Sequence, residues 1–173
     1  PSDEPMEGLS SAGKLFSTSG GALEALLRTI YSKYNGKELS NPRINKLRNA
    51  RHLKETTLRL GKKEINVAAV SGMSNAVKLL EDNKNEKSDY GIIEIMACQG
   101  GCVNGGGQPI SDNESIVKNR SKLIYDTDNR DMIRFAHKNP EVIKLYKEFL
   151  SEPLSKENQK FLCTKYSERE VLL

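Results

Sequence analysis

Apolar and polar positions recur with helical spacing in the first part of the chain. Between Leu23 and Tyr34 the apolar residues fall every three or four positions, which predicts an amphipathic helix. Gly36 follows where helices commonly end, and Thr18 or Ser19 is suited to cap the start. The Gly-, Ser- and Thr-rich loop before this helix has the character of an anion-binding helix start, although an ordinary capped helix explains the same pattern.

The middle of the chain has the pattern of a sheet. The polar and basic stretch Asn35–Leu53 predicts a loop with at most a short helix. Thr56–Leu60 and Glu64–Val70 have the composition of two strands joined by a tight connection. A helix over about Ser74–Glu81 then leads to the apolar run Ile92–Met96, which predicts a third, buried strand. Strand, helix and strand at this spacing predict a parallel crossover unit.

The last third of the chain is polar and helical. Glu114–Asp126 is one predicted helix, and Asn139 followed by Pro140 is a strong start for a second. Ser155–Tyr166 predicts a last short helix. The sequence therefore predicts an α/β fold with a parallel-sheet lobe and flanking helices over residues 1–110. A C-terminal helical tail is predicted over residues 111–173.

Composition excludes several classes of protein. The 173 residues include 27 Lys and Arg against 23 Asp and Glu, and the two signs interleave along the chain. A net charge of +4 distributed in this way does not indicate a nucleic-acid partner. No apolar run approaches the length of a membrane span. Three cysteines are an odd number that fits a reducing compartment, so we expect a cytoplasmic protein without a membrane partner.

The most distinctive chemistry follows the third predicted strand. Cys98 and Cys102 stand among five glycines, in a loop that continues to Gln108 and Pro109. Glycine lets a backbone approach a ligand closely, and thiolates with nearby N–H groups are typical of a metal–sulfur centre. The spacing alone leaves open a reactive thiol pair or two unrelated cysteines. In an open α/β sheet, this loop lies at the carboxyl end of a strand, where sites gather.

The run from Glu94 to Pro109 resembles the third cysteine motif of the iron-only ([FeFe]) hydrogenases, E-x-M-A-C-x-x-G-C-x-x-G-G-G-Q-P. In that family the first cysteine ligates a [4Fe-4S] cluster. The second ligates the same cluster and bridges to a two-iron unit that carries CO and cyanide, and the whole is the H-cluster. The resemblance implies that Cys98 and Cys102 are the metal ligands, with Cys102 as the bridging one.

A second segment, starting at Phe16, is similar to the hydrogenase pattern F-G-x-T-G-G-x-x-E-A-x-L-R, which lies against the cluster. The resemblance implies that Phe16 and Met96 pack around the two-iron unit. Ser17, Gly20 and Gly101 are then expected to line the cofactor. Ser17 stands where glycine is usual in the family, so its extra bulk is expected to affect turnover more than cluster binding.

The tail is similar to the part of these hydrogenases that is a separate small subunit in some members. Matching residues include Arg120, Tyr125, Asp128, Arg134 and Asn139. Other residues of the chain have structural interpretations. We expect Cys163 to be a packed core thiol, His52 to be solvated, and His137 to orient the helix that follows it.

The resemblance covers only the second half of the hydrogenase catalytic domain. A [4Fe-4S] cluster takes four thiolates, and the family's two earlier cysteine motifs do not occur here. The H-cluster would therefore be shared with an N-terminal half, in the same parent chain or in a separate subunit. The implied reaction is 2H⁺ + 2e⁻ ⇌ H₂, with ferredoxin or another redox carrier as electron partner.

Three other interpretations stay open. One is a sensory hydrogenase with low turnover. Another is a non-catalytic iron–sulfur protein related to the factors of cytosolic cluster assembly, against which the hydrogenase-like tail argues. The last is an α/β domain that binds no metal, which gives no reason for two cysteines among five glycines.

Overall fold

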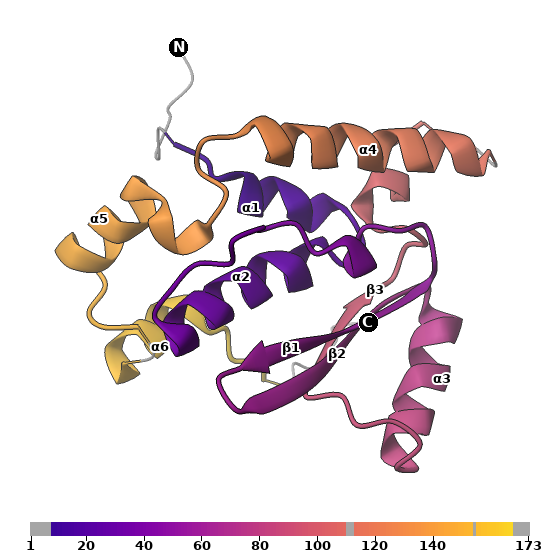
Figure 1. The fold of residues 1–173 in the computed structure, drawn as a ribbon, viewed down its shortest axis with the longest axis horizontal. Coiled ribbons are helices and arrows are strands. Elements are labelled where there is room, and N and C mark those ends of the chain that lie inside the picture. Colours follow the sequence, from indigo (N-terminus) through magenta and orange to yellow (C-terminus); the bar gives the residue numbers. More distant parts are fainter. Residues whose placement is uncertain (1–7, 110–112, 154, 168–173) are drawn as a thin grey trace, which may run out of the picture.

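The computed structural model describes residues 8–109, 113–153 and 155–167, and it contains a three-stranded sheet with helices on both faces (Figure 1). β1 (Leu53–Leu60) pairs antiparallel with β2 (Lys63–Ser71), and β2 pairs parallel with β3 (Ile92–Met96). The predicted α/β fold and its parallel crossover are confirmed. The expectation that Ile92–Met96 is a buried strand is wrong, because β3 lies at the edge of the sheet and none of its residues is fully buried. The sheet is mixed because a tight turn joins only antiparallel neighbours. The expected boundary after residue 110 lies outside the described residues.

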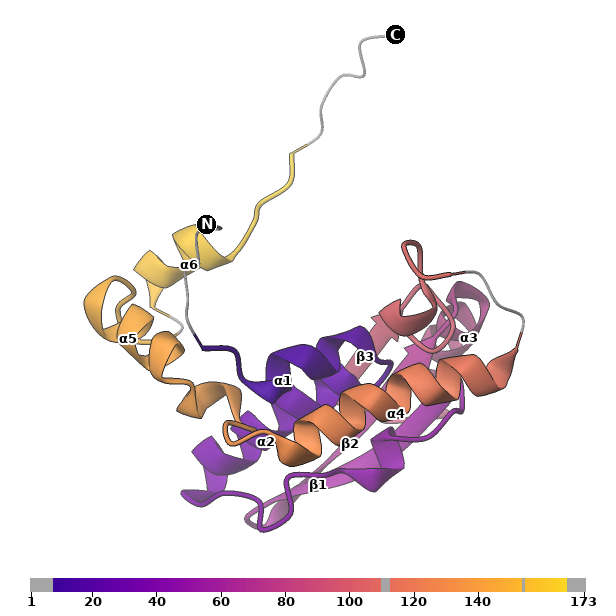
Figure 2. The ribbon, with the colours of Figure 1, turned by 90° about the horizontal axis from the view of Figure 1, so that it is seen from above.

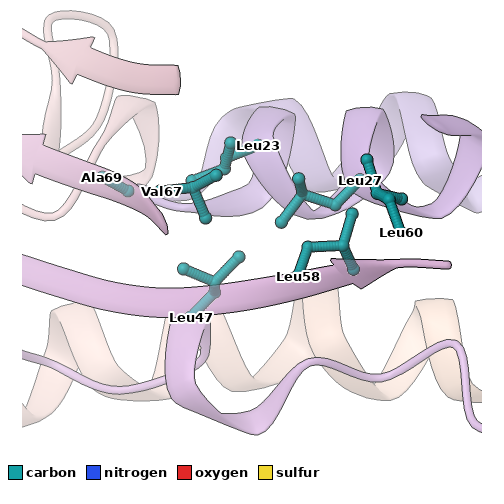
Figure 3. Close-up of a cluster of buried hydrophobic side chains, with 7 residues drawn as sticks. All are labelled: Leu23, Leu27, Leu47, Leu58, Leu60, Val67 and Ala69. Atoms are coloured by element: carbon teal, nitrogen blue, oxygen red, sulfur yellow. The ribbon is translucent and has the colours of Figure 1, made fainter. Parts of the chain in front are cut away.

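Two helices cover the two faces of the sheet. α2 (Gly21–Asn35) packs its apolar stripe on one face, and the crossover helix α3 (Met73–Lys84) packs on the other. Because β2 is covered on both sides, all residues from Val67 to Ser71 are buried. This central strand is the rigid frame from which the loops at its carboxyl end project. The larger core, shown in Figure 3, consists of Leu23, Leu27, Leu47, Leu58, Leu60, Val67 and Ala69.

The tail contributes three helices to the outside of this lobe. α4 (Glu114–Arg130) runs beside the short N-terminal helix α1 (Ser11–Lys14), and α5 (Pro140–Glu148) and α6 (Lys156–Leu162) follow it (Figure 2). The predicted start of α5 is confirmed, since the Asn139 side chain accepts a hydrogen bond of 3.0 Å from the Glu141 N–H. Within the described parts of the chain, every helix is too short or too polar to cross a bilayer.

The structure contradicts the expectations for Cys163 and His137 in the tail, and it agrees with the expectation for His52 before β1. Cys163 is exposed at the end of α6, because that helix buries only Asn158. The His137 ring does not orient α5. It lies 3.1 Å from the Thr29 hydroxyl and 3.0 Å from the Glu38 carboxylate, and so joins the tail to α2 and the loop after it. His52 is exposed.

A buried network of charged side chains joins the tail to α2. The Arg28 guanidinium on α2 and the Asp128 carboxylate on α4 are fully buried and share hydrogen bonds of 2.9 and 2.8 Å. Arg28 also donates to Glu24 at 2.9 Å, and Arg48 pairs with both carboxylates. Arg134 adds a further contact of 2.9 Å to Asp128. Each buried charge of this network therefore has an opposite partner, which offsets the cost of placing charge in a protein interior.

The environment of Asp128 determines how this network responds to acid. Burial by itself raises the pKa of the Asp128 carboxyl, but hydrogen bonds from Arg28, Arg134, Ser11 and Arg48 hold it well below its usual range. The folded pKa is thus lower than the unfolded value of about 3.8. Asp128 consequently stabilises the fold above that pH, and its contribution is lost as the pH falls below it.

Replacement of Asp128 by Asn tests this network. We expect the free energy of unfolding at pH 7 to fall by about 3–5 kcal/mol, because Arg28 is left buried without its main counter-charge. Urea unfolding of the intact protein measures this change. The difference between parent and variant is expected to shrink when the pH is lowered below about 3.8.

Asp82→Asn is the matched control. Asp82 makes an exposed pair with Lys87 at 3.5 Å, and such pairs contribute at most about 1 kcal/mol. Equal losses in the two variants would contradict the special role of the buried network.

Candidate functional site

The two cysteines lie at the carboxyl end of the parallel strands. Cys98 comes two residues after the end of β3, and Cys102 begins a 3-10 turn over Cys102–Asn104. Both thiols are free and exposed. The loop between them is closed by a hydrogen bond of 3.1 Å from the Gly101 N–H to the Cys98 carbonyl.

The second glycine run folds back against both cysteines. A Cβ atom placed on Gly105 would lie 3.2 Å from the Cys98 sulfur and 3.5 Å from the Cys102 Cα. The Gly105 N–H donates to the Cys102 carbonyl at 3.0 Å. The lack of a side chain at this position leaves room beside the two thiols, which is what a ligand larger than a single ion requires.

Gly101 brings the cysteine loop into contact with the loop before α2. The Ser19 N–H donates to the Gly100 carbonyl at 3.0 Å. A Cβ on Gly101 would lie 2.6 Å from the Ser19 nitrogen and 3.0 Å from the Met96 sulfur, and its φ of +95° is itself unfavourable for other residues. Glycine at this point is therefore required by both conformation and space.

The structure brings most of the sequence-predicted site residues to this junction. Met96 packs its sulfur beside Gly101, and Gly20 adopts a φ of +84° at the start of α2. The Phe16 ring is 55% exposed on the same loop. The Ser17 hydroxyl is turned back to the Lys14 carbonyl, to which it donates at 2.8 Å. The Phe16 ring is thus available for contact with a ligand, whereas the Ser17 hydroxyl already has a hydrogen-bond partner.

Glu94 was not among the predicted site residues, although it is the cap of α2. Its carboxylate accepts hydrogen bonds of 2.5 Å from the Gly20 N–H and 2.6 Å from the Leu23 N–H. The expected capping by Thr18 or Ser19 is wrong, since the structure assigns neither side chain to the first turn of the helix. The helix start does bind an anion, but the anion is Glu94 from β3. An acidic residue inside an apolar strand was the available signal.

A buried cation, the ammonium of Lys54, lies next to the loop before α2. Lys54 is only 4% exposed, and its ammonium donates to the Ser19 carbonyl. Burial lowers the pKa of Lys54 to about 8, although the negative charges of Glu94 and Glu24 act in the opposite direction. The available signal was strand alternation, because Lys54 falls on the same face of β1 as the buried Leu58 and Leu60.

The tail holds the cysteine loop from outside. The Arg120 guanidinium on α4 donates to the Val103 carbonyl at 3.1 Å and to the Pro109 carbonyl at 2.9 Å. These two bonds fix both ends of the segment that contains Gly105 to Gly107. The lobe and the tail therefore both contribute to the geometry of the thiols.

The donor set fits part of a cluster site. In the described residues, no group of three or more His, Cys, Asp or Glu side chains converges as a metal site would require. Cys98 and Cys102 supply two thiolates, whereas a [4Fe-4S] cluster takes four. Two exposed thiols beside a glycine-rich backbone fit one side of such a cluster.

Two family models match nearly all of the chain. The model described as "Iron only hydrogenase large subunit, C-terminal domain" matches residues 1–106. The chain belongs to this iron-only hydrogenase family. The model described as "Iron hydrogenase small subunit" matches residues 114–169. The resemblance drawn from the cysteine motif is confirmed.

Curated relatives and solved structures agree with this family assignment. The NADP-reducing hydrogenase subunit HndD of Solidesulfovibrio fructosivorans is 33% identical over 171 residues, which are 98% of this chain and 29% of the relative. An [FeFe]-hydrogenase structure, HydA1 from Chlamydomonas reinhardtii, superposes with a TM-score of 0.71 at 32% identity. The match covers 95% of this chain and 48% of that one. This hydrogenase-family chain thus spans about a third of its curated relatives and about half of the solved structure.

The curated relatives also include proteins that are not named as hydrogenases. Protein NAR1 of Arabidopsis thaliana is 33% identical over 177 residues, covering 96% of this chain and 36% of the relative. The match includes the tail. The expectation that the tail separates hydrogenases from cluster assembly factors is therefore wrong.

Gly101→Ala tests the junction between the two loops. We expect the variant to lose about 2 kcal/mol or more of unfolding free energy, because alanine is strained at this φ and its methyl group overlaps the Ser19 backbone. Denaturant unfolding and the iron content of anaerobically purified protein would be measured together, and both should fall.

Gly106→Ala provides the control within the same loop. A Cβ on Gly106 meets nothing within 4 Å. Iron content should stay at the parental level in this variant. If Gly101→Ala behaves like Gly106→Ala, the close approach to Ser19 does not hold the loop.

Proposed function

We propose that this chain is the C-terminal half of an iron-only hydrogenase catalytic domain. It would help to hold the H-cluster for the reaction 2H⁺ + 2e⁻ ⇌ H₂. The observation that carries the proposal is the position of Cys98 and Cys102. Both thiols are exposed beside Gly105, in a loop that is fixed by Ser19 on one side and Arg120 on the other.

Roles for the individual residues follow from this arrangement. Cys98 and Cys102 would ligate the [4Fe-4S] cluster, and Cys102 would also bridge to the two-iron unit with its CO and cyanide. The cofactor itself supplies the hydrogen chemistry. Met96 and the exposed Phe16 ring would pack against the two-iron unit and exclude water from it. The list of residues proposed to line the cofactor is completed by Ser17, Gly20 and Gly101.

The remaining ligands would come from an N-terminal half. This proposal is supported by the coverage of 48% of the solved hydrogenase chain. Residues 1–110 would form the cluster-binding lobe and residues 111–173 the tail that clasps it, as Arg120 does. We also infer ferredoxin or another redox carrier as electron partner, and a cytoplasmic location, which suits free and exposed thiols.

A second candidate function is participation in cytosolic iron–sulfur cluster assembly. The similarity to NAR1, and to the probable cytosolic Fe-S cluster assembly factor narfl of Dictyostelium discoideum at 33% identity over 175 residues, favours it. Such a protein would hold the [4Fe-4S] cluster without the two-iron unit. A sensory hydrogenase is a variant of the first proposal, in which Ser17 in place of glycine slows turnover.

Infrared spectroscopy distinguishes these functions. The complete protein would be produced in cells with a hydrogenase maturation system and purified without oxygen. CO and cyanide bands together with H₂ production would support the hydrogenase proposal. Bound iron and sulfide without these bands or H₂ would favour the assembly function, and weak H₂ production with the bands would indicate the sensory variant.

Cys102→Ala is the decisive variant within the hydrogenase proposal. We expect it to lose the CO and cyanide bands and to reduce H₂ production at least ~100-fold. The effect should exceed the 10–100-fold typical of residues that only surround a metal site, because a bridging ligand is removed.

Cys163→Ala is the control for this loss, since that thiol is exposed at the end of α6. It should keep the bands and the activity. Intact bands in Cys102→Ala would exclude the bridging role, whatever the activity of the control.

A further inference from the structure

A cavity of about 600 Å³ opens beside the cysteine loop, away from the thiols. Its walls come from three places: the loop between α2 and β1, one side of α4, and the backbone around Gln99, Gly100 and Asn104. Figures 1 and 2 both show α4 passing this part of the chain. The volume is within the range of pockets that hold small molecules.

The cavity is lined by positive charge that the protein does not neutralise. Among the described residues, the Arg43 and Arg51 side chains make no ion pair, and both are exposed at the mouth. Asp126 is the acidic residue of the lining, and its carboxylate lies 3.6 Å from Lys122. Arg48 also borders the cavity, but its charge is balanced by the buried network. The two free guanidiniums therefore give the mouth a net positive field.

A third cation lies deeper in the same cavity. Lys54 is nearly fully buried, and the structure gives its ammonium one hydrogen-bond acceptor, the neutral carbonyl of Ser19. The carboxylates of Glu94 and Glu24 act on it electrostatically without a direct ion pair. A cation in such a site gains more from an added negative charge than an exposed one, because little water screens the interaction. An anion that enters the cavity would thus contact Arg43 and Arg51 first and Lys54 last.

Neutral groups complete the lining. Asn49, Asn104 and Ser121 offer polar side chains, and Val117 and the ring of Tyr125 offer apolar surface. A ligand with a charged end and a flat or apolar part would find partners for both. Guanidinium groups bind both carboxylate and phosphate oxygens in a bidentate manner, and a phosphate group brings more negative charge to a cluster of cations than a carboxylate does.

We infer that this cavity is a binding site for a small molecule with at least two phosphate groups, up to the size of a nucleotide. Arg43 and Arg51 would hold the phosphates at the mouth, and Lys54 would face the innermost oxygens. The inference does not rest on the proposed hydrogenase function, because none of these residues is a cluster ligand. A bound molecule would nevertheless touch Gln99 and Gly100, which separate Cys98 from Cys102. Occupancy would therefore stiffen the loop that holds the thiols.

Calorimetric titration of the intact, anaerobically purified protein with pyrophosphate tests this inference. We expect saturable binding with one site per chain, and at least tenfold weaker binding of sulfate at the same ionic strength. Arg43→Gln combined with Arg51→Gln should weaken pyrophosphate binding at least tenfold. Both side chains are exposed, so this double variant should keep the fold.

The control is Lys62→Gln combined with Lys63→Gln, which removes the same charge at the far end of the β1–β2 hairpin. It should bind pyrophosphate as the parent does. Equal weakening in both double variants, or no binding of pyrophosphate at millimolar concentration, would overturn the inference. The inference would also be overturned if the parent did not bind pyrophosphate and the Arg43→Gln and Arg51→Gln double variant lost affinity for an acidic redox protein. That result would identify a protein-docking surface. Cys102→Ala should bind pyrophosphate as the parent does. Failure of the hydrogenase proposal can therefore be distinguished from failure of the phosphate-site inference.

Discussion

The pairing of Arg28 with Asp128 is the constraint on which the rest of the structure depends. One charge belongs to the helix that packs on the sheet and the other to the tail, and both are removed from water. Glu24 on α2 and Arg134 in the tail each supply a further partner, but loss of either member of the central pair leaves a buried charge with fewer opposite charges, which is costly. Correct docking of the tail is therefore coupled to the packing of α2. Through α4 and Arg120, the same docking fixes the segment that follows the cysteines.

Glu94 makes the corresponding connection inside the lobe. Glu94 stands on β3 four residues before Cys98, and its carboxylate binds the first turn of α2. The loop with Phe16 and the loop with the thiols are therefore both attached to this one residue. Gly101 then allows the two backbones to touch. Sheet, helix and cysteine loop thus have a fixed relation near the thiols, which is maintained by the Glu94 carboxylate and by backbone contacts. Such an arrangement keeps two sulfurs exposed on a rigid support.

The regular elements could be predicted from the sequence, because periodicity and strong end signals act locally. The apolar stripe after Leu23 and the Asn139–Pro140 start are examples. The pairing partners of buried charges could not be predicted, since Glu24 and Arg28 have the appearance of an ordinary helical ion pair until Asp128 meets them from a hundred residues away. The cap of α2 was missed for the same reason. Local candidates at Thr18 and Ser19 were displaced by a carboxylate from a distant strand, and Lys54 owes its burial to that same junction.

The order of strands in the sheet has a consequence for the isolated chain. β3 lies at an edge, with β2 as its partner in the described structure, and Ile95 is 43% exposed on it. An uncovered edge strand with apolar side chains is a template for pairing with another strand. Where nothing pairs with β3, the strand that leads to Cys98 is therefore the edge of the described sheet at which another strand can add. Strand pairing and cysteine chemistry are linked here, because whatever covers the edge of β3 also lies next to the thiols.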